Sequence, residues 1–330
     1  ITGGSMLLRC LMAALKKKGV PIHYNTKAVK LLANDVMEVE GVACITPEGR
    51  KHYRAKGGVI LTTGGFGANE AMVCQYIGPW ASRLIVRGSP WITGENILMT
   101  QEVHAKLVNM DQFYAGPITP TGHANPSPLM HAGYGIQVGT NGKRFVPETW
   151  LQVPKAKAIA QRTPDNRSFM LIGQDADAND NILSNTIKRF SRLGYEVFKG
   201  ETIEEVAKKA GINADNLKAT VAKYNGFVKA KKDADFGRPV EYMKAEISAE
   251  GPYYIVEQKP RFATTMGGVC TDDHLNIIRE DGKVIPNLYA AGELVGGVMG
   301  DDSPAGANVG WALTSGRVAA DAIAEALGKK

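Results

Sequence analysis

Hydrophobic periodicity divides the chain into helical and extended segments. Leucines recur over residues 5–18 at the spacing of one helical face and a glycine follows them, which predicts a helix. The alternation of Ile22 and Tyr24 predicts short strands within residues 20–32. Residues 58–62 form a continuous apolar run that ends in glycines. Such a run is typical of a buried parallel strand whose carboxyl end meets a ligand crevice.

The texture of the sequence changes in the middle of the chain. Over residues 71–245 prolines and aromatic residues increase, and amphipathic helices are predicted over residues 202–210 and after an N-cap at Asn213. Short strands and glycine turns return over residues 246–330, where Asp281–Gly282 is a hairpin signal. We therefore expect residues 71–245 to be a cap inserted between two parts of another domain.

Composition and charge narrow the class of protein. The 330 residues are 44% hydrophobic and 22% charged, which is the composition of a soluble globular protein long enough for two domains. The net charge of +6 is spread along the chain, so we expect no nucleic-acid partner. No run approaches the ~20 apolar residues of a membrane span, so none is expected.

Cysteines, histidines and the first residues add further expectations. The 4 cysteines form no CxxC pair and the 6 histidines form no HxxH or HExxH pattern, so we expect reduced thiols and no metal site. The segment that opens at Ile1 resembles the interior of a protein, without an initiator methionine or a leader. We expect the natural N-terminus to lie upstream, and cytoplasmic localisation is assigned only by default.

Three glycine-rich strand ends are the candidates for ligand binding, at residues 62–67, 264–268 and 292–308. Each can bring backbone N–H groups close to a ligand, although any one of them alone is equally consistent with a tight turn. Three in one chain favour a large planar or phosphorylated cofactor. A closing helix is expected from Asn308, and its positive amino end can face negative charge, unless it is an ordinary surface helix.

The chain resembles the fumarate reductase / succinate dehydrogenase flavoprotein group, which includes 3-ketosteroid dehydrogenase-like and flavocytochrome c-like members. The resemblance extends over residues 3–324, nearly the whole chain, with its segments in the same order and at similar spacing. The matching segments are residues 58–69 (GVILTTGGFGAN), 235–238 (DFGR), 265–269 (TMGGV) and 285–293 (IPNLYAAGE).

The resemblance implies an α/β fold with FAD as the cofactor. Residues 1–70 and 246–330 would form a Rossmann-like FAD-binding domain that is incomplete at its N-terminus, and residues 71–245 an inserted α+β capping domain. The family carries a GxGxxG loop near its N-terminus, and the glycines of residues 64–67 do not have that spacing. We therefore expect this loop to precede Ile1, so that the chain alone would hold FAD weakly.

The resemblance also assigns cofactor contacts residue by residue. It places Ala28 and Val29 near the adenine, Glu293 on a hydroxyl of the ribose or ribityl part, and Asn308 and Val309 at the pyrimidine edge of the isoalloxazine. Glycines at the strand ends would pass close to the dinucleotide. The full set of expected cofactor-binding residues is Ala28, Val29, Thr63, Gly64, Gly65, Gly292, Glu293, Asn308 and Val309.

The charged substrate residues of fumarate reductases are replaced in this chain. The proton-donor arginine is expected near Gln152, one histidine at Ala263 or Thr264, another histidine at Gly116 and an arginine at Ser303. A dianion in such a pocket would be desolvated without a partner, at a cost of several kcal/mol. Fumarate or succinate is therefore not the expected substrate.

The same comparison predicts an apolar substrate pocket. Residues 298–300 followed by Ser303–Pro304 are closer to the steroid-dehydrogenase branch than to the fumarate branch. The best match is an enone, or another uncharged or mono-anionic substrate that is partly hydrophobic. The residues expected to line the pocket are Tyr114, Trp150, Met266, Met299 and Pro304.

We expect hydride transfer between flavin N5 and a carbon beside an electron-withdrawing group. Tyr114 is the first candidate for the protic group, and Thr264 and Ser303 are candidates to polarise the carbonyl. The alternative for Tyr114 is a packed cap aromatic whose hydroxyl is bonded locally, and the alternative for Trp150 is core packing. The direction of the reaction and the electron donor or acceptor stay open.

The sequence leaves two other hypotheses of function open. The first is a non-catalytic binding module or subunit that has lost its active-site charges. The second is a different flavin reaction, such as amine or hydroxyl oxidation, against which the pattern at residues 235–238 argues.

Overall fold

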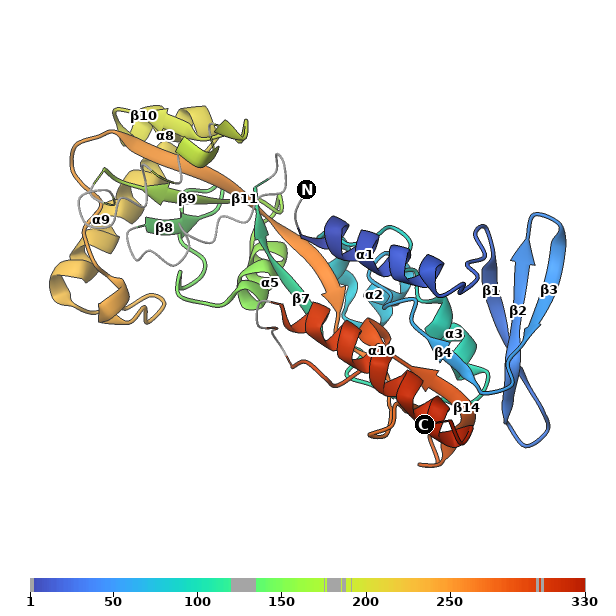
Figure 1. Cartoon of the computed structure of the whole chain (residues 1–330). Coiled ribbons are helices and arrows are strands. Elements are labelled where there is room, and N and C mark those ends of the chain that lie inside the picture. The colour runs from blue at the N-terminus through green and yellow to red at the C-terminus, as the bar shows by residue number, and fades with distance from the viewer. Residues whose placement is uncertain are drawn as a thin grey trace.

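The computed structural model describes residues 3–119, 135–174, 176, 185, 188–190, 192–300, 303 and 306–329. Two lobes lie side by side, and the long strand β11 (Tyr253–Thr265) runs from one into the other (Figure 1). We call them the cap lobe and the base lobe. The cap lobe is built around β8 (Gly135–Val138), β9 (Ser168–Ile172), β10 (Phe198–Gly200), α8 (Ile203–Ala210), α9 (Ala214–Ala230) and η2 (Val240–Tyr242), and the base lobe holds the remaining elements apart from β11, which belongs to both. The two lobes have separate hydrophobic cores.

The base lobe combines short sheets with helices from both ends of the chain. Its elements are α1 (Gly4–Lys17), β1 (Lys27–Ala33), β2 (Val39–Thr46), β3 (Gly49–Arg54), β4 (Val59–Leu61), α2 (Glu70–Tyr76), η1 (Pro79–Arg83), β5 (Ile85–Val86), α3 (Glu95–Gln101), β6 (Leu107–Val108), β7 (Phe113–Ile118), α5 (Gln152–Arg162), β12 (Gly268–Val269), β13 (Asn276–Ile278), β14 (Val284–Ala290), η3 (Gly292–Leu294) and α10 (Ala307–Ala326).

The strand predicted at residues 58–62 is β4, and it pairs with β14 in parallel. Leu61 lies opposite Ala290, so the two strands end at the same edge of the sheet. Both are followed directly by glycine-rich segments, which the parallel pairing therefore brings together. The Asp281–Gly282 signal is also confirmed, because β13 and β14 are antiparallel on either side of it.

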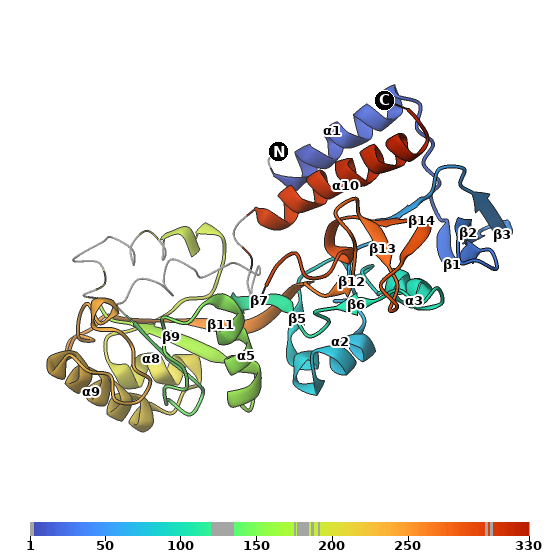
Figure 2. The ribbon, with the colours of Figure 1, turned by 90° about the horizontal axis from the view of Figure 1, so that it is seen from below.

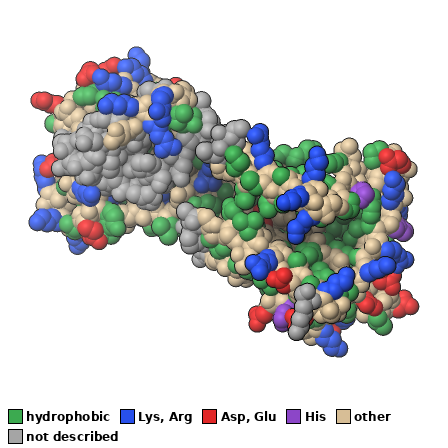
Figure 3. Space-filling view, in the orientation of Figure 1, with side chains coloured by type: hydrophobic (Ala, Val, Ile, Leu, Met, Phe, Trp, Pro, Cys, Tyr) green, Lys and Arg blue, Asp and Glu red, His purple; other side chains and the backbone are tan. Residues whose placement is uncertain are grey.

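The first and last helices lie side by side across the base lobe in both views (Figures 1 and 2). The predicted helix over residues 5–18 is confirmed as α1, and none of its residues is buried. Leu8 is 60% exposed on it, and Val309 of α10 is 54% exposed. Hydrophobic side chains accordingly gather on the face of the base lobe that carries these helices (Figure 3).

The cap lobe places two helices on an antiparallel sheet. Its elements are β8 (Gly135–Val138), β9 (Ser168–Ile172), β10 (Phe198–Gly200), α8 (Ile203–Ala210), α9 (Ala214–Ala230) and η2 (Val240–Tyr242). The strand order is β10-β11-β9-β8. Both predicted helices are confirmed, and the side chains of Thr202 and Asn213 cap them by accepting hydrogen bonds from backbone N–H groups.

One local prediction was wrong. Residues 20–26 belong to no strand, and Tyr24 is 70% exposed, whereas the strand begins at Lys27. The alternation there has no neighbouring strand to bury it, and a two-residue period without a partner does not make a strand. The core of the base lobe includes Met72 and Phe113, beyond the expected boundary at residue 70. The domain limits at residues 70/71 and 245/246 stay predictions.

Candidate functional site

Two glycine turns follow the paired ends of β4 and β14. Gly64 has φ +80° and Gly292 has φ +72°, a backbone region that side chains with a Cβ rarely adopt. A Cβ added at Gly65 would lie 1.8 Å from Thr265 Oγ1 and 2.8 Å from Glu293 Oε1. Glycine at this position therefore lets the segment after β4 pack directly against Thr265 and Glu293.

Glu293 is held in place by Thr265. The backbone N–H of Thr265 donates to Glu293 Oε1 at 3.1 Å, and the Thr265 hydroxyl lies 3.2 Å from the same oxygen. The other oxygen, Oε2, lies 3.5 Å from the position that a Cβ would take at Gly64. The carboxylate thus sits between the two glycine turns, where it can accept a hydrogen bond from a ligand hydroxyl.

Side chains of α10 anchor the second turn from the opposite side. The Gly292 N–H donates to Ser315 Oγ at 2.9 Å, and Trp311 Nε1 donates to the Gly292 carbonyl at 3.1 Å. Sequence reasoning missed both anchors. Trp311 and Ser315 are four residues apart and so share one face of the helix. This spacing points to the turn only once the turn is known to lie beneath that face.

A cavity of about 350 Å³ lies beside these turns and the start of α10. It brings together five residues that the sequence assigned to the cofactor or the chemistry: Thr264, Gly292, Glu293, Asn308 and Val309. The remaining lining is largely apolar. The other lining residues are Leu7, Leu11, Thr265, Met266, Val295, Val298, Met299, Trp311, Ala312 and Leu313.

A second cavity of about 600 Å³ is lined by Ala28 and Thr63, on the side where the resemblance expects the adenine. Asn96 also lines it, is only 1% exposed, and neither of its amide atoms has a hydrogen-bond partner in the described part of the chain. Val29 is half-buried and is not part of the lining. Gly64 and Gly65 follow Thr63 and continue from this cavity toward Glu293.

The three catalytic candidates lie at the first cavity or next to its lining. Tyr114 of β7 is the cross-strand partner of Thr264 in β11, and Thr264 lines the cavity. Ser303 Oγ lies 3.1 Å from Asn308 Oδ1, at the first turn of α10. Tyr114 itself is half-buried and adjoins the cavity through Thr264 rather than lining it.

The expected apolar pocket is formed only in part. Met266 and Met299 line the first cavity, but Trp150 lies in a different one, with Val153 and Lys157 of α5. The Arg162 guanidinium lies 5.4 Å from the centroid of the Trp150 ring and holds it against that helix. Pro304 lies outside the described residues.

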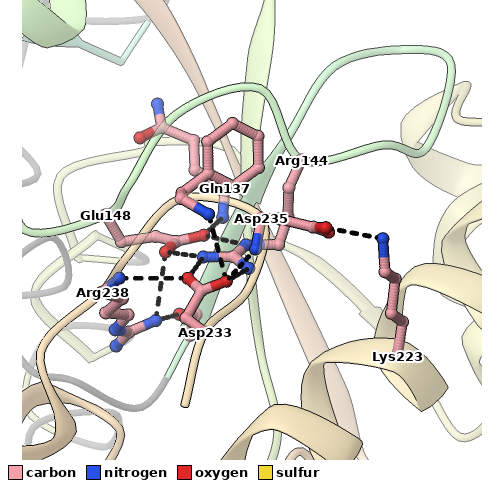
Figure 4. Close-up of polar contacts among 9 residues, drawn as sticks. Gln137, Arg144, Glu148, Lys223, Asp233, Asp235 and Arg238 are labelled. Atoms are coloured by element: carbon pink, nitrogen blue, oxygen red, sulfur yellow. Dashed lines mark hydrogen bonds and ion pairs between the residues drawn. The ribbon is translucent and has the colours of Figure 1, made fainter.

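A cluster of buried charges lies in the cap lobe (Figure 4). Arg144 pairs with Glu148 at 2.7 Å and with Asp233 at 2.8 Å, and Arg238 approaches Glu148 at 3.3 Å. Burial opposes the charge of Arg144, but the bonds to both carboxylates raise its pKa above the ordinary value. Two guanidinium groups and two carboxylates therefore compensate each other in the interior.

Two classes of feature are absent from the part of the chain that the structure describes. No group of three or more histidine, cysteine, aspartate or glutamate residues there is arranged to hold a metal ion. Among the same residues, no helix has the length and apolar character needed to cross a membrane.

Known proteins share this architecture. A urocanate reductase of Eggerthella lenta is 32% identical over 313 residues, covering 92% of this chain and 50% of the relative. A 3-oxosteroid 1-dehydrogenase of Mycobacterium tuberculosis is 29% identical over 368 residues, covering 99% of this chain and 64% of the relative. The open conformation of a flavocytochrome c3 fumarate reductase matches with a TM-score of 0.77 and 28% identity, over 96% of this chain and 54% of that chain.

The chain thus spans between half and two thirds of the length of these relatives. The likeness confirms the expected resemblance to fumarate reductases and ketosteroid dehydrogenases, and the expected α/β FAD-binding fold. The FAD binding domain family matches residues 1–309. This chain therefore belongs to the FAD binding domain family, and its cofactor is FAD.

Proposed function

We propose that the protein is an oxidoreductase that transfers hydride between flavin N5 and a C–C bond adjacent to an electron-withdrawing group. The observation that carries this proposal is the first cavity, which gathers Glu293, the start of α10 and Thr264 in one crevice. The relatives named above are a fumarate reductase, a urocanate reductase and a steroid dehydrogenase, and reactions at C–C bonds are common to these.

The residues of this chain fit a bound dinucleotide. Asn96 is among the residues that line the second cavity, and its buried amide atoms have no partner in the described part of the chain, which is costly unless a ligand satisfies them. Glu293 lies between the two cavities with one oxygen fixed by Thr265. Asn308 and Val309 are in the first turn of α10, where unpaired N–H groups favour negative charge.

When bound, FAD supplies hydride exchange with a carbon of the substrate at N5. Tyr114 would exchange the accompanying proton through its phenolic oxygen, because it is paired with Thr264 at the edge of the cavity. The Thr264 hydroxyl, which lies 3.3 Å from the Thr265 carbonyl, would turn toward a substrate oxygen to polarise it. Ser303 would act from the side of Asn308.

An uncharged or mono-anionic substrate suits this site better than a dicarboxylate. Met266 and Met299 make the lining apolar. The space above Gly116, where a histidine is expected in fumarate reductases, is taken by an amide: a Cβ at Gly116 would lie 2.4 Å from Gln152 Oε1. A neutral acceptor at this position offers no compensation for a second carboxylate.

Anaerobic flavin spectroscopy on the FAD-loaded protein tests the proposal in both directions. Dithionite-reduced protein is mixed with 4-phenylbut-3-en-2-one, with cinnamate or with fumarate, and oxidised protein is mixed with the saturated counterparts. We expect the flavin absorbance to change with a phenyl-substituted compound at least tenfold faster than with fumarate or succinate. A flavin that responds to none of them would indicate a binding module, and rapid reaction with fumarate would overturn the substrate class.

A further inference from the structure

Arg261 is a buried arginine without a carboxylate partner in the described part of the chain. Its side chain belongs to β11, and the residue is 5% exposed. None of the ion pairs of the described residues includes it, and its Nε has no hydrogen-bond partner there. A buried guanidinium normally has an anion beside it, because a desolvated charge without compensation is costly.

Its surroundings are positive or neutral. The Arg261 guanidinium carbon lies 5.5 Å from the centroid of the Tyr114 ring. Arg87, whose backbone N–H donates to the Phe262 carbonyl at 2.9 Å, brings a second positive charge. Burial and the charge of Arg87 lower the pKa of Arg261, against the opposing effect of Tyr114. The ring and the hydroxyl of Tyr114 both favour the charged guanidinium, but a single phenolic oxygen cannot match the fork of N–H groups as the two oxygens of a carboxylate do.

Arg261 is not itself part of the lining of the first cavity, but it belongs to the same strand as Thr264, which is. In the pairing of β11 with β7, Arg261 lies opposite Gly116, and Thr264 lies opposite Tyr114. Thr264 lines the cavity and is three residues along the strand, which corresponds to about 10 Å. Tyr114 contacts the Arg261 guanidinium and is also paired with Thr264. A small conjugated acid has the length to reach from one to the other.

We propose that Arg261 is the anion-binding residue of the substrate site, and that it takes the single carboxylate of an α,β-unsaturated acid. This inference rests on the proposed function and narrows its substrate class to mono-anions. Arginine suits this role because its planar donors match both oxygens of a carboxylate. For such an acid the carboxylate is the electron-withdrawing group, so Arg261 rather than the Thr264 hydroxyl polarises it, and Tyr114, whose ring contacts the guanidinium, lies beside the double bond.

Two ligands of matched shape distinguish the contribution of the carboxylate charge to binding from the contribution of shape. Cinnamate and 4-phenylbut-3-en-2-one share the same conjugated skeleton, and only the first carries a carboxylate. Their dissociation constants are measured on the oxidised, FAD-loaded protein through the perturbation of the flavin absorbance, and by calorimetry. We expect R261Q to raise the ratio of the cinnamate constant to the ketone constant about ten- to hundredfold, since a bond to a charged group is lost.

Three further variants complete the test. R261K keeps the charge and loses the fork, so it should raise the ratio about tenfold. R87Q should raise it about two- to threefold, because the exposed Arg87 acts only through its charge. R317Q alters an exposed arginine of α10 and should leave the ratio unchanged. FAD content should stay that of the wild type in all four, since none of the three altered arginines belongs to the set of expected cofactor-binding residues.

The outcomes distinguish this inference from the proposed function. If R261Q and R261K leave the ratio within twofold of wild type, the inference is overturned even where both compounds turn over. If neither compound reacts but cinnamate binding weakens selectively in R261Q, the anion site stands and the proposed function fails. Loss of FAD in R261Q and R261K alike would place Arg261 at the cofactor instead and would also overturn the inference.

Discussion

The buried arginines of the cap lobe and the buried arginine of β11 differ in their compensation. Arg144 and Arg238 share Glu148, and Arg144 also binds Asp233. Arg261 is also buried, yet no ion pair among the described residues includes it, and the side chains that act on its charge are those of Tyr114 and Arg87. Charges that serve the fold are neutralised within the fold, whereas a charge left unbalanced next to a cavity indicates a ligand of opposite sign.

The largest expected effect comes from breaking the compensated cluster. Asp233→Asn removes a charge that pairs with Arg144 at 2.8 Å and also accepts backbone N–H groups of residues 235, 236 and 238. We expect the free energy of unfolding to fall by about 3–5 kcal/mol, measured by urea denaturation. The control is Glu204→Gln, which breaks an exposed pair with Lys218 and should leave the free energy of unfolding nearly unchanged. A loss below about 1 kcal/mol at Asp233 would contradict the comparison.

Lys155 is a further buried charge beside Glu148 and Arg238, and unlike the arginines of that cluster it forms no ion pair among the described residues. It is 0% exposed, its Nζ has no partner among the described residues, and burial lowers its pKa to about 8 from 10.5. The unfolded chain therefore binds more protons than the folded one between these two values. Below pH 8 the charged Lys155 destabilises the fold in full, and this penalty disappears as the pH rises toward 10.5.

Lys155→Met should accordingly raise the free energy of unfolding by about 3 kcal/mol at pH 7. The gain should shrink steadily between pH 8 and 10.5, as followed by urea denaturation at a series of pH values. Lys157→Met, at an exposed position of the same helix, is the control and should show no such trend. A gain independent of pH would show that packing rather than charge is responsible.

Asn96 is an uncharged buried residue whose hydrogen-bonding groups lack partners among the described residues. Asn96→Leu removes buried amide atoms that lack a partner, so the protein without FAD should be stabilised by about 1 kcal/mol. The same change should weaken FAD binding about tenfold, because the amide can no longer bind the nucleotide. Thermal unfolding with and without FAD, together with flavin titration, measures both. An equal loss of stability in both states would make Asn96 a structural residue.

The smallest expected effect is on the stability conferred by Arg261. Arg261→Met removes an uncompensated buried charge, and the free energy of unfolding should change by less than about 1 kcal/mol or should rise. This outcome is the opposite of that expected for Asp233→Asn, and the two variants are compared in the same denaturation series. A loss of more than about 3 kcal/mol would mean that Arg261 has a structural partner.

Much of the fold was predictable because its signals are local. The N-cap at Asn213 and the helix that starts near Thr202 are read from neighbouring residues, and the apolar run of β4 marks a strand by itself. The glycine turns were predictable for the same reason, because left-handed backbone at Gly64 and Gly292 requires glycine.

The parts that were missed depend on pairings between distant segments. Arg261 becomes significant only when β11 is known to pair with β7, which places Tyr114 beside it. Ser315 acts on Gly292 only because α10 lies over that turn. Trp150, which the sequence left open between pocket lining and core packing, lines a separate cavity beside α5, where the Arg162 guanidinium lies over its ring.

The most direct test is a crystal structure of the FAD-loaded protein with cinnamate bound. We expect the isoalloxazine ring to lie against Gly292, Glu293 and the first turn of α10, with the cinnamate carboxylate within about 3 Å of the Arg261 guanidinium. A flavin ring bound elsewhere, or an Arg261 side chain paired with a carboxylate of the protein itself while cinnamate lies apart from it, would contradict the account.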